Sequence, residues 1–414
     1  MLALRHRRSL CLAREDRPLR RAAAMSVASA LVAGNDPRSA LAEEALAQAL
    51  ARTGASHATG VLLFLTPDFA RHAQQTVSAV ARAAQCTEVA GGIAAGVFSE
   101  HGWVLDRPAA AVMVFAGDLS LDHCQGGVAL DRADRQAVLS YAGGSFPYPW
   151  GDATKRRFGG SFAGSGGGSA PTAWQHSRLA PSCSVQLRGA QVDVGVSSGW
   201  SLLAEPQPIE RSRAYDLLQL GGENGLDSLL AALPADLREQ SPLPLGALSA
   251  VLFDEDRAGS AGGVASLGSA LASGDAFAAG AWHSTAILSA NAADRSVSLA
   301  EGTKPGQRLA WAIRRPQSAV DDMRRSVEQL AAAVAKPLAG LVFSCFGRGP
   351  YFHGGDDCEL ACLRQRFPGL PLLGVYGTGQ IAAGAAGGNR SLHNAVVTAL
   401  ISHPPRRPHV QSQS

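Results

Sequence analysis

Two distant stretches of the chain repeat one order of secondary-structure elements. Residues 60–66 (GVLLFLT) predict a buried strand, residues 67–84 a helix, and residues 89–98 (VAGGIAAGVF) a strand that enters a glycine-rich turn. The same succession recurs from 340–346 (GLVFSCF) to 372–381 (LLGVYGTGQI). The repetition predicts two equivalent strand–helix–strand units over 55–120 and 335–402, in which the helix joins two parallel strands.

The glycines of the two stretches share their spacing. Gly60 matches Gly340 at an offset of 280 residues, while the pairs Gly91/Gly374 and Gly96/Gly379 match at an offset of 283. The difference of three residues falls between the strands, where insertions are tolerated. Chance matches in glycine-rich sequence would give the same picture, so the duplication is a prediction that strand order can test.

The predicted fold class is therefore α/β, of the mixed α+β kind, with two pseudo-equivalent strand–helix–strand units and mixed sheets flanked by helices. Hydrophobic periodicity and turn residues predict the remaining elements. These are helices at 36–53, from about 225 and at 316–335, a strand at 109–115, a loop at 158–174, a hairpin at 182–200, and antiparallel strands within 244–254 and 283–314.

Charge and cysteine content narrow the class of protein. The net charge of +3 arises from residues 1–24, where seven arginines face Glu15 and Asp16, which leaves the remaining chain at about −2. A near-neutral body predicts neither nucleic acid nor membrane as a partner. We expect residues 1–24 to be a disordered basic tail, or Met25 to be the true start, and residues 403–414 to be a second disordered tail. The seven scattered cysteines favour reduced thiols in a soluble cytoplasmic protein.

The glycine-rich segments predict a binding site. Glycine in a strand weakens it unless another backbone or a ligand comes close, so the glycines form either tight turns or a pocket wall. We expect the second alternative, with Gly374, Gly377 and Gly379 facing the Gly91–Gly96 segment. The complete set of predicted ligand-binding residues is Gly91, Gly92, Gly96, Cys345, Arg348, Gly374, Tyr376, Gly377, Gly379 and Gln380.

Arg348 is the predicted source of charge in this pocket, because a guanidinium between two glycines can turn toward a carboxylate. A surface arginine in a loop is the alternative. Tyr376 would stack on the ligand or hydrogen-bond to it, or would instead be a half-buried tyrosine with a satisfied hydroxyl.

Cys345 allows a second class of function, a thiol-dependent hydrolase or transferase in which His353 assists the thiol. The alternative is a small buried side chain at the end of a strand. His353, Asp356 and Asp357 could ligate a metal, but the two aspartates are more simply the start of a helix before Glu359. Cys358 and Cys362 are expected to pack. We predict no catalytic residue, no metal and no cofactor.

The stretches GLVFSCFGRGPYFHG and LPLLGVYGTGQIA resemble the FIST C domain, whose motif combines a strand ending in Ser/Ala-Cys, a Gly-Arg pair and a downstream glycine turn around a tyrosine. The upstream VAGGIAAGVFSEHGWVLDRPAAAVMVF is similar to the FIST N domain. The resemblance implies a FIST N-like domain over 36–205 and a FIST C-like domain over 206–402.

The resemblance also implies a function. FIST domains are small-ligand-binding sensory modules, with amino acids and their derivatives as the usual proposal. A small-molecule ligand and a signalling partner protein of unknown identity would follow, without a fused output domain. Gln380 stands where the family has a glutamate, so a ligand carboxylate should matter more here than a cationic amine.

Overall fold

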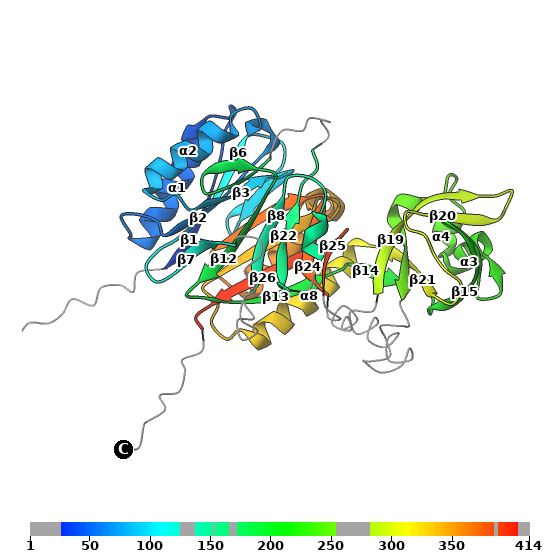
Figure 1. The fold of residues 1–414 in the computed structure, drawn as a ribbon. Coiled ribbons are helices and arrows are strands. Elements are labelled where there is room, and N and C mark those ends of the chain that lie inside the picture. The colour runs from blue at the N-terminus through cyan, green and yellow to red at the C-terminus, as the bar shows by residue number, and fades with distance from the viewer. Residues whose placement is uncertain are drawn as a thin grey trace, which may run out of the picture.

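The computed structural model describes residues 26–124, 137–151, 154–164, 172–253, 282–384 and 388–404. The predicted tail at 1–24 lies outside these residues, as does the predicted tail at 403–414 except for its first two residues. Four β-sheets organise the chain, three of six strands and one of eight. Figure 1 shows the three six-stranded sheets packed together with helices outside them, and the eight-stranded sheet set to one side. The predicted mixed α/β class is confirmed.

The first sheet belongs to the N-terminal part of the chain. Its strand order is β1 (Val27–Ala33), β6 (Ala109–Phe115), β2 (Gly60–Leu65), β3 (Val89–Ile93), β10 (Ala173–Gln175) and β11 (Arg178–Ala180). Strands β2 and β3 are parallel and the other neighbours are antiparallel. Helices α1 (Ser39–Thr53) and α2 (Ala73–Ala84) bury one face each against its outer side, and a 3-10 turn at Pro67–Phe69 precedes α2.

The second sheet contains the C-terminal strands. Its order is β13 (Gln191–Ser197), β26 (Val396–Ser402), β22 (Ala339–Cys345), β23 (Leu372–Gly377), β4 (Gly96–Ser99) and β5 (Gly102–Val104), again with one parallel pair, β22 and β23. Helices α8 (Pro316–Ala333) and α9 (Cys358–Arg366) cover it. Two 3-10 turns, Phe346–Arg348 and Pro350–His353, separate β22 from α9.

The third sheet mixes strands from both halves of the chain. Its order is β7 (Ser120–His123), β12 (Ser182–Arg188), β8 (Val138–Ala142), β9 (Arg157–Ser161), β24 (Gly379–Ala383) and β25 (Asn389–Leu392), with β8 and β9 parallel. A 3-10 turn at Tyr148–Gly151 lies between β8 and β9. Two expectations were wrong here. Part of the expected loop at 158–174 is strand β9, and the expected hairpin at 182–200 does not form, because β12 and β13 pair in different sheets.

All three six-stranded sheets share one design. The strands that form them belong to three successive units, namely unit one (β1–β6), unit two (β7–β12) and unit three (β13–β26). In each unit the first strand pairs antiparallel with the last strand, and the last strand pairs antiparallel with the second. The second strand runs parallel to the third. Each sheet is then completed by a hairpin from another unit. Unit one lends β4–β5 to the second sheet, unit two lends β10–β11 to the first, and unit three lends β24–β25 to the third. The body is thus a cyclic arrangement of three units, β1–β6, β7–β12 and β13–β26.

The predicted duplication is confirmed, with one correction and one addition. Strand order is the same in the two predicted units, and Gly91 and Gly374 occupy equivalent positions, opposite Leu63 and Val342. The match of Gly60 with Gly340 was wrong by one residue. The strand registers show that the residue of unit three equivalent to Gly60 is Ala339. The unit formed by β7–β12 was not predicted at all.

Equivalent aromatic rings meet where the three units join. Phe64, Tyr141 and Phe343 each stand on the second strand of their unit, at the same register position. Their ring centroids are 5.0 Å (Phe64–Tyr141), 6.2 Å (Phe64–Phe343) and 6.4 Å (Tyr141–Phe343) apart. These rings lie in one buried cluster that draws side chains from all three sheets, so the centre of the body is a packed core.

The fourth sheet is an insertion in unit three, between β13 and α8. Its strands are β14 (Trp200–Leu202), β15 (Gln207–Arg213), β16 (Asp216–Leu220), β17 (Glu223–Asn224), β18 (Leu248–Phe253), β19 (Trp282–Asn291), β20 (Ser296–Leu299) and β21 (Arg308–Arg314). Because β21 pairs with both β15 and β18, six of them close into a small barrel. Helices α3 (Gly225–Ala232) and α4 (Ala235–Arg238) and a 3-10 turn (Leu245–Ala247) complete it.

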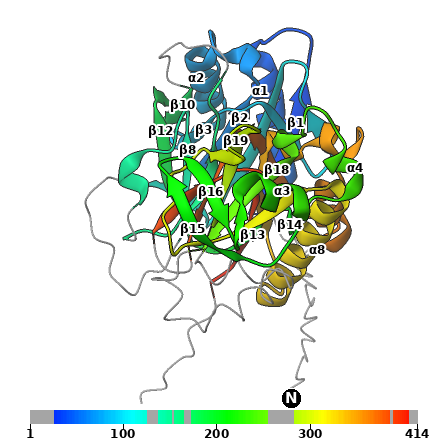
Figure 2. The same cartoon turned by 90° about the vertical axis from the view of Figure 1, so that its right-hand side faces the viewer.

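Figure 2 shows this barrel in front of the three-unit body. The expected boundary between residues 205 and 206 falls inside the barrel, between β14 and β15. Within the described residues, none of the helices combines the length and the apolar character that a membrane crossing requires.

Candidate functional site

The glycines of the predicted pocket wall are in close contact with protein atoms. A Cβ atom on Gly91 would lie 1.9 Å from the carbonyl oxygen of Leu63, and one on Gly374 would lie 2.0 Å from the ring of Phe98. Gly92, Gly96, Gly377 and Gly379 would meet neighbours at 2.4–2.6 Å. The two segments do lie side by side, since Gly96 pairs with Tyr376 across β4 and β23. Close packing against other protein atoms explains these glycines, within unit one for Gly91 and Gly96 and between units for the other four.

Arg348 lies in the interior, with no exposed side-chain surface. Its Nε and Nη2 atoms lie 2.8 and 2.7 Å from Oε1 of Glu359. The terminal nitrogens also donate to the carbonyl oxygens of Ser197, Ala319 and Asn394 and to the Ser197 hydroxyl. The guanidinium therefore connects β13, α8, α9 and the turn before β26, and its donors are already engaged by protein acceptors.

Tyr376 and His353 lie with Arg348 on the helix-covered side of the second sheet. The Tyr376 hydroxyl donates to Asp357, whose other carboxylate oxygen accepts from the backbone of Glu359 and Leu360 and so caps α9, as predicted for a helix start. Burial raises the pKa of Asp357, and burial together with the Asp357 carboxylate raises that of Tyr376. His353 lies 3.3 Å from Glu359, so its observed polar partner is that carboxylate, not Cys345.

Cys345 ends β22, and its register neighbour is Gly377, whereas Ser344 is paired with Tyr376. Because neighbouring strand residues point to opposite faces, Cys345 and Tyr376 lie on different sides of the sheet. The structure thus divides the predicted site residues into two groups. Arg348 and Tyr376 belong to a buried polar network below the helices, while Cys345 faces the junction with the barrel.

Three side chains from distant parts of the chain meet at this junction. The Cys345 Sγ atom lies 3.8 Å from Oδ1 of Asn394, and the same oxygen accepts a hydrogen bond of 2.7 Å from Nη1 of Arg314. Arg314 is the last residue of barrel strand β21. It also donates to the carbonyl oxygens of Gly347 and Gly246 and lies 5.3 Å over the ring of Phe352. Burial lowers the pKa of Arg314, and the nearby Cys345 opposes that shift.

Two donors at this junction have no acceptor among the described residues. They are Nε of Arg314 and Nε2 of Gln380, both buried. The Gln380 side chain is fully buried, and its Oε1 accepts from the backbone nitrogen of Ala395, next to Asn394. Buried donors without an acceptor are uncommon, and a water molecule or an anion would satisfy both of them. A cation, an amide and a thiol around Asn394 and Ala395 are suited to hold a small oxyanion such as a carboxylate.

Arg314 and Asn394 were missed by the sequence analysis. The sequence does place Arg314 at a strand end, because Arg314 and Arg315 stand directly between an apolar strand and Pro316. Nothing local could show that this strand end reaches β22. In the part of the chain that the structure describes, no cluster of three or more His, Cys, Asp or Glu side chains could hold a metal ion.

Comparison with known proteins identifies part of the chain. The family model of the FIST C domain matches residues 248–383, a range that includes Arg314, Cys345 and Gln380. An uncharacterized protein of Mycobacterium tuberculosis is 26% identical over 213 residues, which is 50% of each chain. An uncharacterized protein of Mycobacterium bovis is 31% identical over 108 residues, 26% of this chain and 28% of that protein. The chain spans about half the length, or less, of the curated relatives it matches. The FIST N-like assignment of 36–205 stays a prediction.

Proposed function

We propose that this chain, whose residues 248–383 match the FIST C domain, is a sensory protein that binds a small carboxylate or amino acid where the barrel meets the three-unit body. The observation that carries the proposal is the pair of buried, unpartnered donors, Arg314 Nε and Gln380 Nε2, beside Cys345. Domain junctions are common places for small-molecule sites.

Each residue has a distinct role in the proposed site. Arg314 supplies the positive charge through Nε, Gln380 a neutral donor through Nε2, and the Cys345 thiol, which donates to Asn394, lines the site at the end of β22. Gly347 leaves room for the guanidinium, since a Cβ atom there would lie 2.8 Å from Arg314 Nη1. Arg348, Tyr376 and the glycines Gly91, Gly92, Gly96, Gly374, Gly377 and Gly379 hold the strands in place and do not touch the ligand.

Transmission of the signal would follow from the position of the site. A ligand held by Arg314 from the barrel and by Cys345 and Gln380 from the body stabilises one relative placement of the two parts. A signalling partner protein would then read that placement. A cytoplasmic location is part of the proposal, supported by the free cysteines of the described residues.

The test is a thermal-shift screen with amino acids and small carboxylates, followed by measurement of dissociation constants. A ligand at about 100 times its dissociation constant should stabilise the protein by about 2.7 kcal/mol. Arg314→Gln should weaken a carboxylate ligand at least about tenfold, as expected for loss of a charge-assisted hydrogen bond. Arg324→Gln, at an exposed arginine of α8, is the matched control and should bind normally.

Gln380→Glu gives an independent outcome. The new carboxylate should repel a ligand carboxylate and favour ligands that present an ammonium group. Unchanged carboxylate affinity in both Arg314→Gln and Gln380→Glu would exclude this site. Rapid alkylation of Cys345 near neutral pH, with turnover of a thioester or ester, would instead support the thiol-dependent enzyme.

A further inference from the structure

A separate cavity opens on the opposite end of the second sheet, where β22 and β23 begin. Its volume is about 460 Å³, within the range of about 300–1,000 Å³ typical of small-molecule sites. Three segments form it: the start of β1 from unit one, the residues before β22, and the turn between α9 and β23. It is therefore a groove between units one and three, and it is distinct from the junction that contains Arg314.

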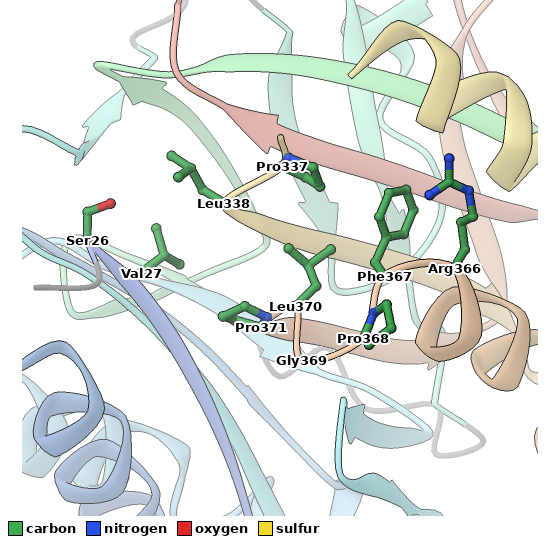
Figure 3. A pocket seen from close by; sticks show the side chains of 10 residues that line it. All are labelled: Ser26, Val27, Pro337, Leu338, Arg366, Phe367, Pro368, Gly369, Leu370 and Pro371. Carbon is green, nitrogen blue, oxygen red and sulfur yellow. The ribbon is translucent and has the colours of Figure 1, made fainter. Parts of the chain in front are cut away.

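The walls of this groove are apolar and stiff. Figure 3 shows Leu338, Phe367 and Leu370 around its middle, with Val27 at the end formed by β1. Three of the ten lining residues are prolines, whose backbones are restricted in the free protein, so little order has to be gained on binding. A wall of this kind favours an aliphatic chain through apolar contact.

Of the residues that line the groove, one is charged: Arg366, at the other end. Arg366 lies at the last turn of α9, with its guanidinium 5.3 Å over the ring of Phe367 and its Nε atom 3.0 Å from Oε2 of Glu328. The first contact places the guanidinium over the ring, and the second engages its Nε atom. Its two terminal Nη atoms have no acceptor among the described residues, and the side chain is 42% exposed. They present the paired donors that a carboxylate binds.

We propose that this groove binds a monocarboxylate with an aliphatic chain, the chemistry of a medium-chain fatty acid. The chain lies against Leu338, Phe367 and Leu370, and the carboxylate pairs with the terminal nitrogens of Arg366. An amino acid is too polar for these walls, and an uncharged lipid offers no acceptor to the terminal nitrogens of Arg366. The groove therefore selects for an apolar chain and an anionic end together.

The experiment measures dissociation constants of the full chain for decanoate, octanoate, butyrate and decanol by calorimetry. Decanoate should bind, and each methylene removed should weaken binding about fourfold. Decanol should bind at least about tenfold more weakly than decanoate. Arg366→Gln should remove that preference for the carboxylate, while Arg364→Gln, in the same turn of α9 and outside the groove, should behave as wild type.

A second variant, Ser26→Trp, blocks the groove. Ser26 lines the groove and is only partly buried, so the indole would fill the groove without the loss of a core side chain. It should abolish decanoate binding and leave the melting temperature of the free protein unchanged. Equal binding of decanol and decanoate, or normal decanoate binding by Ser26→Trp, would overturn the proposal. So would decanoate binding that is lost in Arg314→Gln and retained in Arg366→Gln, because the carboxylate would then occupy the junction site.

Discussion

The guanidinium of Arg348 and the carboxylate of Glu359 form an ion pair of 2.7 Å in which neither side chain is more than 4% exposed. Breaking a buried pair leaves an uncompensated charge, at a cost of about 3–5 kcal/mol. Arg348→Ala should therefore lower the free energy of unfolding by about that amount in urea titrations. Arg324→Ala, at an exposed pair with Asp321, should change it by less than about 0.5 kcal/mol. A stable Arg348→Ala protein would mean that Glu359 finds another partner.

The contact between Phe64 and Tyr141 should be measurable as a coupling between units one and two. Their centroids are 5.0 Å apart in an edge-to-face arrangement, which is worth about 0.5–1.5 kcal/mol beyond burial. A double-mutant cycle with Phe64→Leu and Tyr141→Leu should return that coupling energy. The cycle of Phe69→Leu with Tyr141→Leu is the control, because Phe69 is buried in a different cluster. Equal couplings in both cycles would show that the ring contact adds nothing specific.

Asp357 makes stability depend on pH in a defined direction. Burial raises its pKa above the ordinary 3.8, so its favourable contribution is complete below pH 3.8 and is lost as the pH rises through the folded-state pKa. Asp357→Asn keeps a side-chain cap for α9 and cannot ionise. Relative to wild type, this variant should become more stable as the pH is raised from 4 to 8. A stability difference between Asp357→Asn and wild type that stays flat from pH 4 to 8 would refute the assignment.

Gly91 and Gly54 both have a positive φ angle but differ in what surrounds them. Gly54 ends α1 with φ of 68° and has open space where a Cβ atom would be, whereas Gly91 has φ of 145° and would place Cβ 1.9 Å from a backbone oxygen. Gly54→Ala should cost about 1–2 kcal/mol, the price of the left-handed conformation. Gly91→Ala should prevent the normal pairing of β2 and β3 and leave little folded protein by circular dichroism. Comparable melting temperatures for the two variants would contradict this explanation of Gly91.

The fold could be predicted where each element carries its own signal. The helix at 316–335 has a proline at its start and a regular apolar face, and the strands at 60–66 and 340–346 are continuous apolar runs. Unit two lacked such signals. Its strand β9 has two glycines among five residues and adjoins a Gly/Ser-rich segment, so local composition favoured a loop. What makes β9 a strand is pairing with β8 and with β24, and β24 is far away in sequence.

The candidate site was less predictable for the same physical reason. The sequence around Arg348 is glycine-rich and suggests a mobile loop, but its acceptors come from Ser197, 151 residues away, and from Ala319. The junction arginine, Arg314, looks like any residue between a strand and a helix. Only the closure of the barrel, through pairing of β21 with β18 and β15, brings it to Asn394.

The exchange of hairpins among the three units has a consequence for synthesis on the ribosome. The third sheet needs β24 and β25, and Arg157 of β9 is joined to Asn389 of β25 across 232 residues. The second sheet needs β26, and the first needs β10 and β11 from unit two. Units one and two therefore cannot finish their own sheets as they leave the exit tunnel, and the second sheet is complete only once β26 has emerged. The body acquires its final order late, when nearly the whole chain has emerged, and a nascent chain held short of β24 should remain sensitive to protease along units two and three.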